Sequence, residues 1–242
     1  EWQRAHAHDS RDDGLTPLPQ EADRESQLRG RRAAGPAGRA LYQAGLLALT
    51  ALAAVLERLP RRRRPIGDRP IRVMRLIGRA SMGGVAKVTN QTLLRIDPLS
   101  VHTVLVVFGR RGPVSRRIAR APGVRVVRRP LELWPPSWNF RLFRDINLLR
   151  KLIRKHRPDL IHLHEPGAAP AVRIAAALAG VPYLVQLHST YSRRRGHYVP
   201  LHRRLERAAL RRAWMIGHSA EVVEDGLRVL DGRHAPGRRI AL

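Results

Sequence analysis

Residues 160–188 decide the fold, and they read LIHLHEPGAAPAVRIAAALAGVPYLVQLH. Two short apolar runs, Leu160–His164 and Tyr183–His188, each end on a histidine and have the length and composition of buried strands. Between them, Ala168–Ala179 is rich in alanine and is followed by Gly-Val-Pro, which predicts one helix that ends there. These segments form a β-α-β unit, whose two strands are parallel neighbours. Their carboxyl ends open on the same edge of the sheet, where ligands of open α/β sheets bind, so the two histidines are predicted to lie side by side at the site.

The chain on either side of this unit repeats the alternation of strands and helices. We expect further strands at 71–77, 101–108, 124–127, 213–217 and 240–242, and further helices at 85–94, 114–121, 145–156 and 200–212, with Ser219 capping a last helix. The stretch from Leu131 to Phe143 is predicted to be irregular because it contains two adjacent prolines. The fold class is therefore α/β, a doubly wound parallel sheet of the Rossmann-like kind that spans residues 70–242 and has helices on both faces.

Two segments precede this domain. Residues 1–39 are polar, charged and rich in Gly and Pro, and are predicted to be a disordered tail. Residues 40–64 are predicted to be an apolar or amphipathic helix with a basic flank, because 40–56 carry no charge and four arginines follow at 61–64. Three possibilities stay open for this helix, given in order of preference. It packs on its own domain, lies in a membrane interface or spans a membrane.

The charge of the chain is extreme. Among 242 residues, 46 are Lys or Arg and 19 are Asp or Glu, which gives a formal net charge of +27. Such a surface attracts polyanions, whether anionic lipid, nucleic acid or phosphorylated substrates. Aromatic residues make up only 5%, and no recognised nucleic-acid-binding module is present, so nucleic acid is not the expected partner. The absence of cysteine is compatible with a reducing compartment.

A glycine-containing loop follows the first predicted strand. Gly78, Gly83 and Gly84 lie between that strand and the start of a helix, where free backbone N–H groups can face an anion. A Walker-type loop needs a lysine after its second glycine, and the dinucleotide pattern G-x-G-x-x-G is also missing. Nucleoside triphosphatase chemistry is therefore disfavoured, and a ligand-contacting loop is preferred over a simple tight turn.

The histidines are the candidate chemical groups. His162 and His164 are two apart on a strand and share a face. With Glu165 or His188 as a third ligand they could form a zinc site, but no ligand spacing supports it and no metal is expected. A structural hydrogen-bonding role is the plain alternative for His164. His188 is the preferred catalytic residue, because it ends a buried strand just before a loop that contains Tyr191.

Taken in order, these segments resemble the amino-terminal domain of family-four retaining glycosyltransferases of the GT-B fold. The resemblance rests on IRVMRLIGRASMGG at 71–84, RPDLIHLH at 157–164, AAALAGVPY at 175–183 with the histidine at 188, LER at 205–207 and RAWMIGHS at 212–219. It covers about residues 71–242, and its specificity lies in the combination rather than in any single piece. Lys87 departs from the pattern, since relatives often carry a glutamate near this position.

The resemblance implies a reaction and roles for residues. In such enzymes sugar is transferred in the cleft between two Rossmann-like domains, and the amino-terminal domain mainly binds the acceptor. It implies that His188 contacts the transferred sugar and that the glycine pair Gly83 and Gly84 lies by the reaction centre. His164, Glu165 and Tyr191 are the further candidates for acceptor binding.

The expected function is therefore hexosyl transfer from a nucleotide-sugar to a glycan or lipid-linked acceptor, with this chain as the acceptor-binding half. No cofactor is expected, because the nucleotide-sugar is a substrate. A carboxyl-terminal donor domain or chain is expected as partner, without which the isolated chain should not turn over. The expected location is cytoplasmic, peripheral at the inner membrane face. The alternative is a non-catalytic polyanion-binding protein on a Rossmann-like scaffold.

Overall fold

The computed structural model describes residues 35–58, 67–78, 84–108, 118–131, 133, 140–188, 200–229 and 239–241. Most of the predicted tail, the basic run at 61–64, Gly83, Tyr191 and the first half of the helix expected at 114–121 lie outside these residues.

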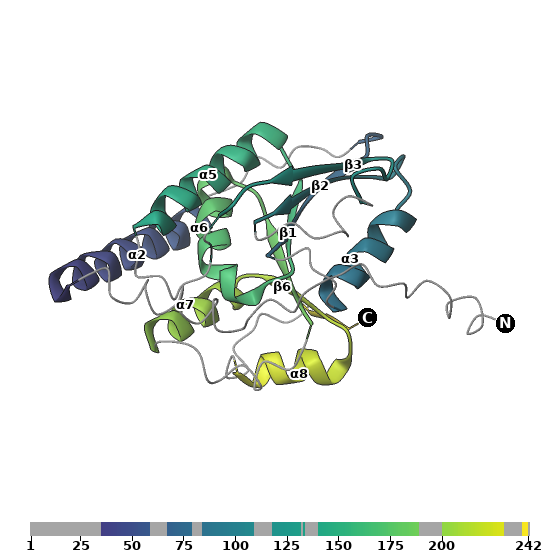
Figure 1. Cartoon of the computed structure of the whole chain (residues 1–242). Helices are drawn as coiled ribbons and strands as arrows, with labels where there is room; N and C mark the ends of the chain where they lie inside the picture. Colours follow the sequence, from purple (N-terminus) through teal and green to yellow (C-terminus); the bar gives the residue numbers. More distant parts are fainter. Residues whose placement is uncertain are drawn as a thin grey trace, which may run out of the picture.

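A parallel sheet of seven strands forms the centre of the described chain (Figure 1). Its strand order is β3-β2-β1-β4-β5-β6-β7, and every neighbouring pair is parallel. The strands are β1 Ile71–Ile77, β2 Val101–Val107, β3 Val124–Arg128, β4 Leu160–Leu163, β5 Tyr183–Leu187, β6 Trp214–Gly217 and β7 Arg239–Ala241. The order reverses between β1 and β4, so the predicted doubly wound α/β class is confirmed.

The helices connect the strands as the alternation predicts. They are α2 Pro36–Leu56, α3 Gly84–Arg95, α5 Arg141–His156, the 3-10 turn η2 Pro166–Ala168, α6 Ala169–Ala179, α7 Pro200–Leu210 and α8 Ala220–Val229. The Ser219 hydroxyl accepts a hydrogen bond from the Val222 backbone N–H at 3.3 Å, so the predicted cap of α8 is confirmed.

Most boundaries agree with the prediction to within two residues, and the starts of two helices differ by four. Helix α5 begins at Arg141 rather than at Asp145, because Leu142 continues the buried stripe of Ile146 and Leu149 by one more turn. Residues 141–143, which were expected to be irregular, are therefore helical. Helix α2 begins at Pro36 instead of residue 40, since a proline fits the first turn of a helix.

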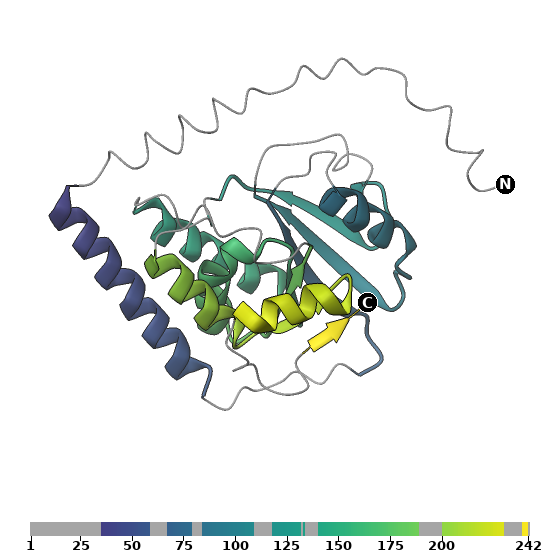
Figure 2. The same ribbon diagram turned by 90° about the horizontal axis from the view of Figure 1, so that it is seen from below.

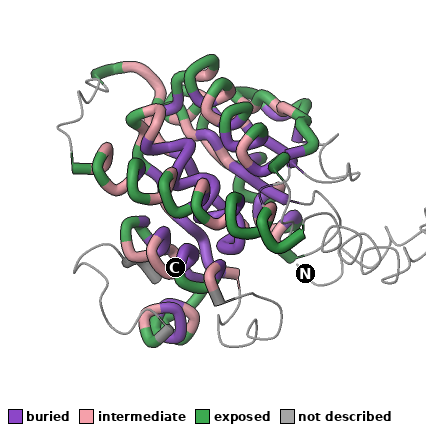
Figure 3. Tube along the Cα trace, turned by 90° about the vertical axis from the view of Figure 1, so that its left-hand side faces the viewer, coloured by how far each residue is buried: buried purple, intermediate pink, exposed green. Residues whose placement is uncertain are grey.

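The sheet has a separate apolar core on each face. Successive residues of a strand point to opposite faces, so Leu76 packs in the larger cluster with α5 and α6, whereas Ile77 packs in the smaller cluster with α3 (Figure 1). Helices therefore lie on both faces, as predicted. Burial is concentrated in the strands and in α6, and the outer sides of the other helices are exposed (Figure 3). The histidines of β4 alternate with Ile161 and Leu163 of the larger core, which places them on the α3 side.

Helix α2 packs against α6 along one face and leaves the other face uncovered. Tyr42, Leu46 and Ala53 are fully buried. Arg173 donates two hydrogen bonds to the carboxylate of Glu57, at 2.9 and 2.8 Å, and so ties the end of α2 to α6. Packing on the domain, the first of the three possibilities, thus describes this face. The described chain has one helix long and apolar enough to cross a membrane by length and composition, and it is α2.

Candidate functional site

Four histidine rings form a row across the carboxyl ends of β4, β5 and β6. His162 stacks on His164 with ring centroids 4.2 Å apart, and His164 stacks on His188 at 5.2 Å. His188 meets His218 at 4.8 Å with the rings tilted by 51°. The predicted neighbourhood of His164 and His188 is therefore confirmed, and the row runs one strand further than the sequence analysis anticipated.

We call these four rings the histidine row, and hydrogen bonds connect its three outer rings. His164 Nδ1 lies 3.0 Å from His188 Nε2, and His188 Nδ1 lies 2.7 Å from His218 Nε2. Both ring nitrogens of His188 are thus engaged by other imidazoles. At the inner end, His162 Nε2 donates to the Gln186 Oε1 amide oxygen at 2.9 Å, which fixes the position of that ring.

The two inner rings of the row are buried, and the exposure of the rings increases toward its outer end. His162 and His164 are 8% and 2% exposed, His188 is half-buried and His218 is exposed. Burial lowers the pKa of His162 to about 3, with the charge of Arg75 acting in the same direction. Burial also lowers the pKa of His164 well below its usual value, and the neighbouring imidazoles and Arg75 add to this. The two inner rings are therefore neutral at physiological pH.

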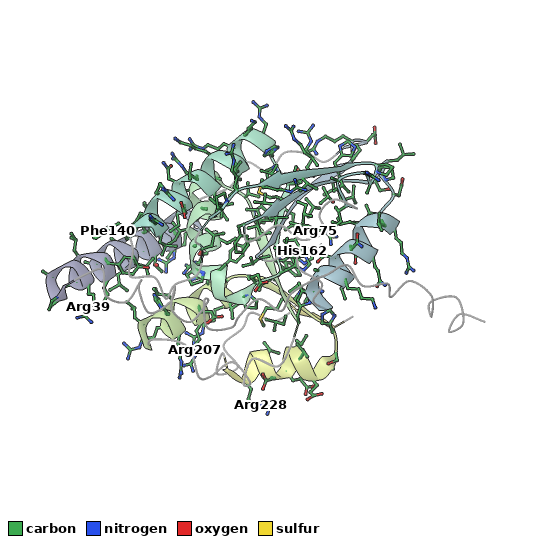
Figure 4. The ribbon with its side chains drawn as sticks, viewed as in Figure 1. Arg39, Arg75, Phe140, His162, Arg207 and Arg228 are labelled. Atoms are coloured by element: carbon green, nitrogen blue, oxygen red, sulfur yellow. The ribbon has the colours of Figure 1, made fainter. Side chains whose placement is uncertain are left out.

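Arg75 lies beside the inner end of the row. It pairs in register with His162 across β1 and β4, and the two side chains lie near each other on the α3 side of the sheet (Figure 4). Among the residues that the structure describes, its buried Nε atom has no hydrogen-bond partner. Burial lowers the pKa of the guanidinium to about 10. An arginine in this position keeps positive charge near the two inner rings and opposes their protonation.

Glu165 and Gly78 meet at the same edge of the sheet. A Cβ atom on Gly78 would lie 3.3 Å from the Glu165 Cγ, so the absence of a side chain lets the carboxylate approach the end of β1. Gly84 is the exposed first residue of α3, at the end of the glycine-containing loop. The roles predicted for Glu165 and Gly84 stay predictions, as do those of Gly83 and Tyr191, which lie outside the described residues.

The burial of His164 bears on its predicted role. His164 is 2% exposed and its ring is hydrogen-bonded to His188. These contacts agree with a structural hydrogen-bonding role, and its predicted part in acceptor binding stays a prediction. Within the described ranges, no cluster of three or more His, Cys, Asp or Glu side chains has the arrangement of a metal site.

Sequence reasoning missed three members of this site, namely Gln186, His218 and Arg75. His218 had a signal, because it follows the apolar run WMIG as the other histidines follow theirs, and Leu187 pairs in register with Gly217. A strand that ends on a histidine next to another such strand predicts neighbouring rings. Arg75 had no comparable signal, since a strand with one face in solvent also carries charged residues at alternate positions.

Solved structures share this fold. A glycosyltransferase from Rickettsia africae is 12% identical with a TM-score of 0.55, over 71% of this chain and 42% of the other. Anabaena HepE in complex with UDP is 16% identical with a TM-score of 0.51, over 72% of this chain and 43% of the other. A UDP-N-acetylglucosamine 2-epimerase is 12% identical with a TM-score of 0.50, over 72% of this chain and 48% of the other. The chain thus spans less than half of these proteins, and at this identity the likeness establishes the fold alone.

The sequence itself gives the family. No curated protein matches the chain. The family model described as a glycosyl transferase 4-like domain matches residues 83–242, which is well over half of the sequence and contains the whole histidine row. The likeness to an amino-terminal GT-B domain agrees with this match. The chain belongs to the glycosyl transferase 4-like domain family.

Proposed function

We propose that this chain is the acceptor-side half of a retaining glycosyltransferase, which transfers a hexosyl group from a nucleotide-sugar to a glycan or lipid-linked acceptor. The observation that carries the proposal is the histidine row at the carboxyl edge of the sheet, within the segment that matches the family. Ligands of open α/β sheets bind at this edge, and imidazoles can donate to or accept from sugar hydroxyls.

Roles for the residues follow from the resemblance to retaining glycosyltransferases. His188 is the central ring of the row and is proposed to lie against the transferred sugar, with His164 holding it from beneath. Gly83 and Gly84 allow the backbone to approach the reacting groups, and Glu165 and Tyr191 bind the acceptor. The nucleotide-sugar acts as a substrate, so the proposal needs no cofactor.

A second Rossmann-like domain completes the site in this proposal. Departure of the nucleoside diphosphate develops negative charge, which has to be stabilised by positioned donors or cations. That domain, on this polypeptide or on another, supplies them. The match of this chain to less than half of each solved structure supports a partner domain, and UDP is bound by the Anabaena protein named above.

The uncovered face of α2 favours an anionic membrane surface as a further partner. Leu41, Leu47, Leu52 and Val55 are between 44% and 64% exposed, along a helix on the outer side of the molecule (Figure 2). Tyr42 contacts Phe143 of α5, and α5 exposes Arg144, Lys151, Arg154 and Lys155. Apolar side chains flanked by cations are typical of helices that lie at the interface of an anionic leaflet. The proposed location is the cytoplasmic face of a membrane.

The experiment uses the complete reading frame that contains this chain. Transfer of radiolabelled hexose from UDP-glucose and other nucleotide-sugars to membrane lipid extracts is measured, and the anomeric configuration of the product is read by NMR. We expect transfer with retention, and about 100-fold less transfer for His188→Gln, the size typical of losing one positioned group.

The controls separate this function from its alternatives. His102→Gln alters an exposed histidine at the opposite end of the sheet and should leave transfer unchanged. The isolated 242-residue chain should not turn over. Absence of transfer by the complete protein, together with nucleic-acid binding that falls steeply with salt, would instead favour the polyanion-binding alternative motivated by the charge of +27.

A further inference from the structure

Both nitrogens of His188 are occupied within the fold, which limits what this ring can do. Nε2 is bonded to His164 and Nδ1 to His218, at 3.0 and 2.7 Å. An imidazole has no other polar atoms. For either nitrogen to reach a ligand, a bond within the row would have to break.

His218 is placed differently. It lies at the outer end of the row and is exposed, and its Nε2 atom is used in the bond to His188. Its Nδ1 atom is the remaining nitrogen of the ring. The residue immediately follows β6, so it lies on the same carboxyl edge as His164 and His188.

The inner rings determine how protons can be arranged along the row. His164 resists protonation because it is buried and lies near other cationic groups, which lower its pKa. When the rings are neutral, the two hydrogen bonds can be arranged in two ways. Either His218 donates to His188 and His188 donates to His164, or His164 donates to His188 and His188 donates to His218. In each arrangement, the direction of the bond between His188 and His218 decides whether His218 Nδ1 carries a proton and donates, or lacks one and accepts.

We propose that His218 makes the polar contact to the ligand, and that His188 is a positioning residue that orients His218 and sets its tautomer. This inference rests on the proposed function and deepens it. The ligand class is a group that can both donate and accept, such as a sugar hydroxyl, which matches either tautomer of His218. His188 then contributes its ring surface and its hydrogen bond rather than a free nitrogen.

The proposal explains the arrangement of the inner residues. Gln186 fixes His162, His162 stacks on His164, and His164 holds His188. Each residue thereby restricts the next, from the buried strands to the exposed end. A ring on the last residue of a strand would otherwise rotate freely, and a positioned donor loses much of its effect when it must first be ordered.

Nitrogen-detected NMR of the ring-labelled protein tests both parts. Spectra of the histidine rings are recorded with UDP-glucose and with methyl glucosides as probes, using the complete protein, and rings are assigned with His102→Gln and His218→Gln variants. We expect a probe to shift the His218 ring nitrogens most. His218→Phe should weaken probe binding by at least tenfold and change the tautomer of His188. His188→Phe should weaken binding and leave His218 without a fixed tautomer, whereas His102→Gln should do neither.

The contrary results are distinct. Probe binding that is unchanged in His218→Phe, or a probe that shifts the His188 nitrogens and not those of His218, overturns the assignment of His218 and leaves the proposed function standing. Failure of the unaltered complete protein to bind any nucleotide-sugar or glycoside overturns the proposed function, and this inference with it.

Discussion

At the scale of single residues, the site depends on keeping buried imidazoles neutral. His162 and His164 are held without charge because water is excluded from them and because Arg75 lies close by. Neutral rings can stack and hydrogen-bond in a row, whereas charged ones would repel each other. The cost appears in acid. The unfolded state takes up protons on these histidines, whereas the folded state cannot accommodate their charge.

This cost predicts acid sensitivity. In the folded protein the pKa of His162 is about 3, and that of an unfolded histidine is about 6.5. As the pH falls below about 6.5, the unfolded state takes up a proton that the folded state does not, so stability is lost progressively down to about pH 3. Each such histidine contributes a slope of up to about 1.4 kcal/mol per pH unit.

The measurement is the free energy of urea unfolding between about pH 4.5 and about pH 6. His162→Gln should make the dependence of this free energy on pH shallower, because about one proton fewer is taken up on unfolding. His102→Gln removes an exposed imidazole outside the histidine row and serves as the matched control. A slope that is equal in both variants and the unaltered protein would contradict the prediction.

Arg75 allows a second test at this scale. Its side chain is half-buried and its Nε lacks a hydrogen-bond partner in the described part of the chain, so this part of the guanidinium has lost water without a compensating bond there. We expect Arg75→Met to stabilise the fold by about 1 kcal/mol, because the methionine fills similar space without that desolvation cost. It should also raise the pKa of His162, although burial, the main cause of the shift, remains.

Urea unfolding and the NMR titration of His162 check these two effects. Arg128→Met, at the exposed end of β3, is the matched control and should change neither. A marked loss of stability in Arg75→Met would show that the guanidinium has a stabilising partner and that its burial is compensated.

At the scale of elements, the contact between α2 and α6 joins segments far apart in the sequence. Residues 116 apart in the sequence, Glu57 and Arg173, form a bidentate ion pair with side chains 10% and 5% exposed. Burial alone would lower the pKa of Arg173, but its hydrogen bond and charge attraction to Glu57 reverse this and raise the pKa. The pair therefore fixes the position of α2 on the domain.

A double-mutant cycle measures this link. Glu57→Gln should cost about 3 kcal/mol of unfolding free energy, because Arg173 is left buried and uncompensated. Replacing both residues with methionine should recover most of that loss, since no charge is then buried. If the double variant is as unstable as Glu57→Gln, the ion pair stabilises the fold by more than the desolvation cost of its two charges.

At the scale of the whole molecule, charge and exposed apolar surface occur on neighbouring helices. Helix α2 has one face on the domain and the other uncovered, and α5 exposes its basic side chains beside it. Deleting the whole segment 40–64 would remove buried Tyr42, Leu46 and Ala53 as well, and so would confuse unfolding with release from a membrane. Surface substitutions avoid this problem.

The double variant Leu47→Glu with Leu52→Glu tests the membrane proposal. These side chains are 50% and 44% exposed, so the fold should tolerate the change. Binding to vesicles that contain phosphatidylglycerol should fall at least tenfold, which corresponds to about 1.4 kcal/mol, less than the transfer of one leucine side chain can supply. The control is Leu99→Glu, since Leu99 is 83% exposed and far from α2 in the sequence. Equal binding of all three proteins would eliminate α2 as the membrane contact.

The sequence alone determined the alternation of strands and helices, the parallel sheet and the pairing of His164 with His188, because hydrophobic periodicity and helix ends are local properties of the chain. Only the tertiary structure decided that His218 joins the histidine row, that Arg75 lies beside it and that Glu57 reaches Arg173. Those contacts depend on which strands become neighbours, in what register, and on which helix covers which face. They are long-range consequences of packing. The apolar run before His218 indicates a histidine at the end of a strand, but not which strand lies next to it.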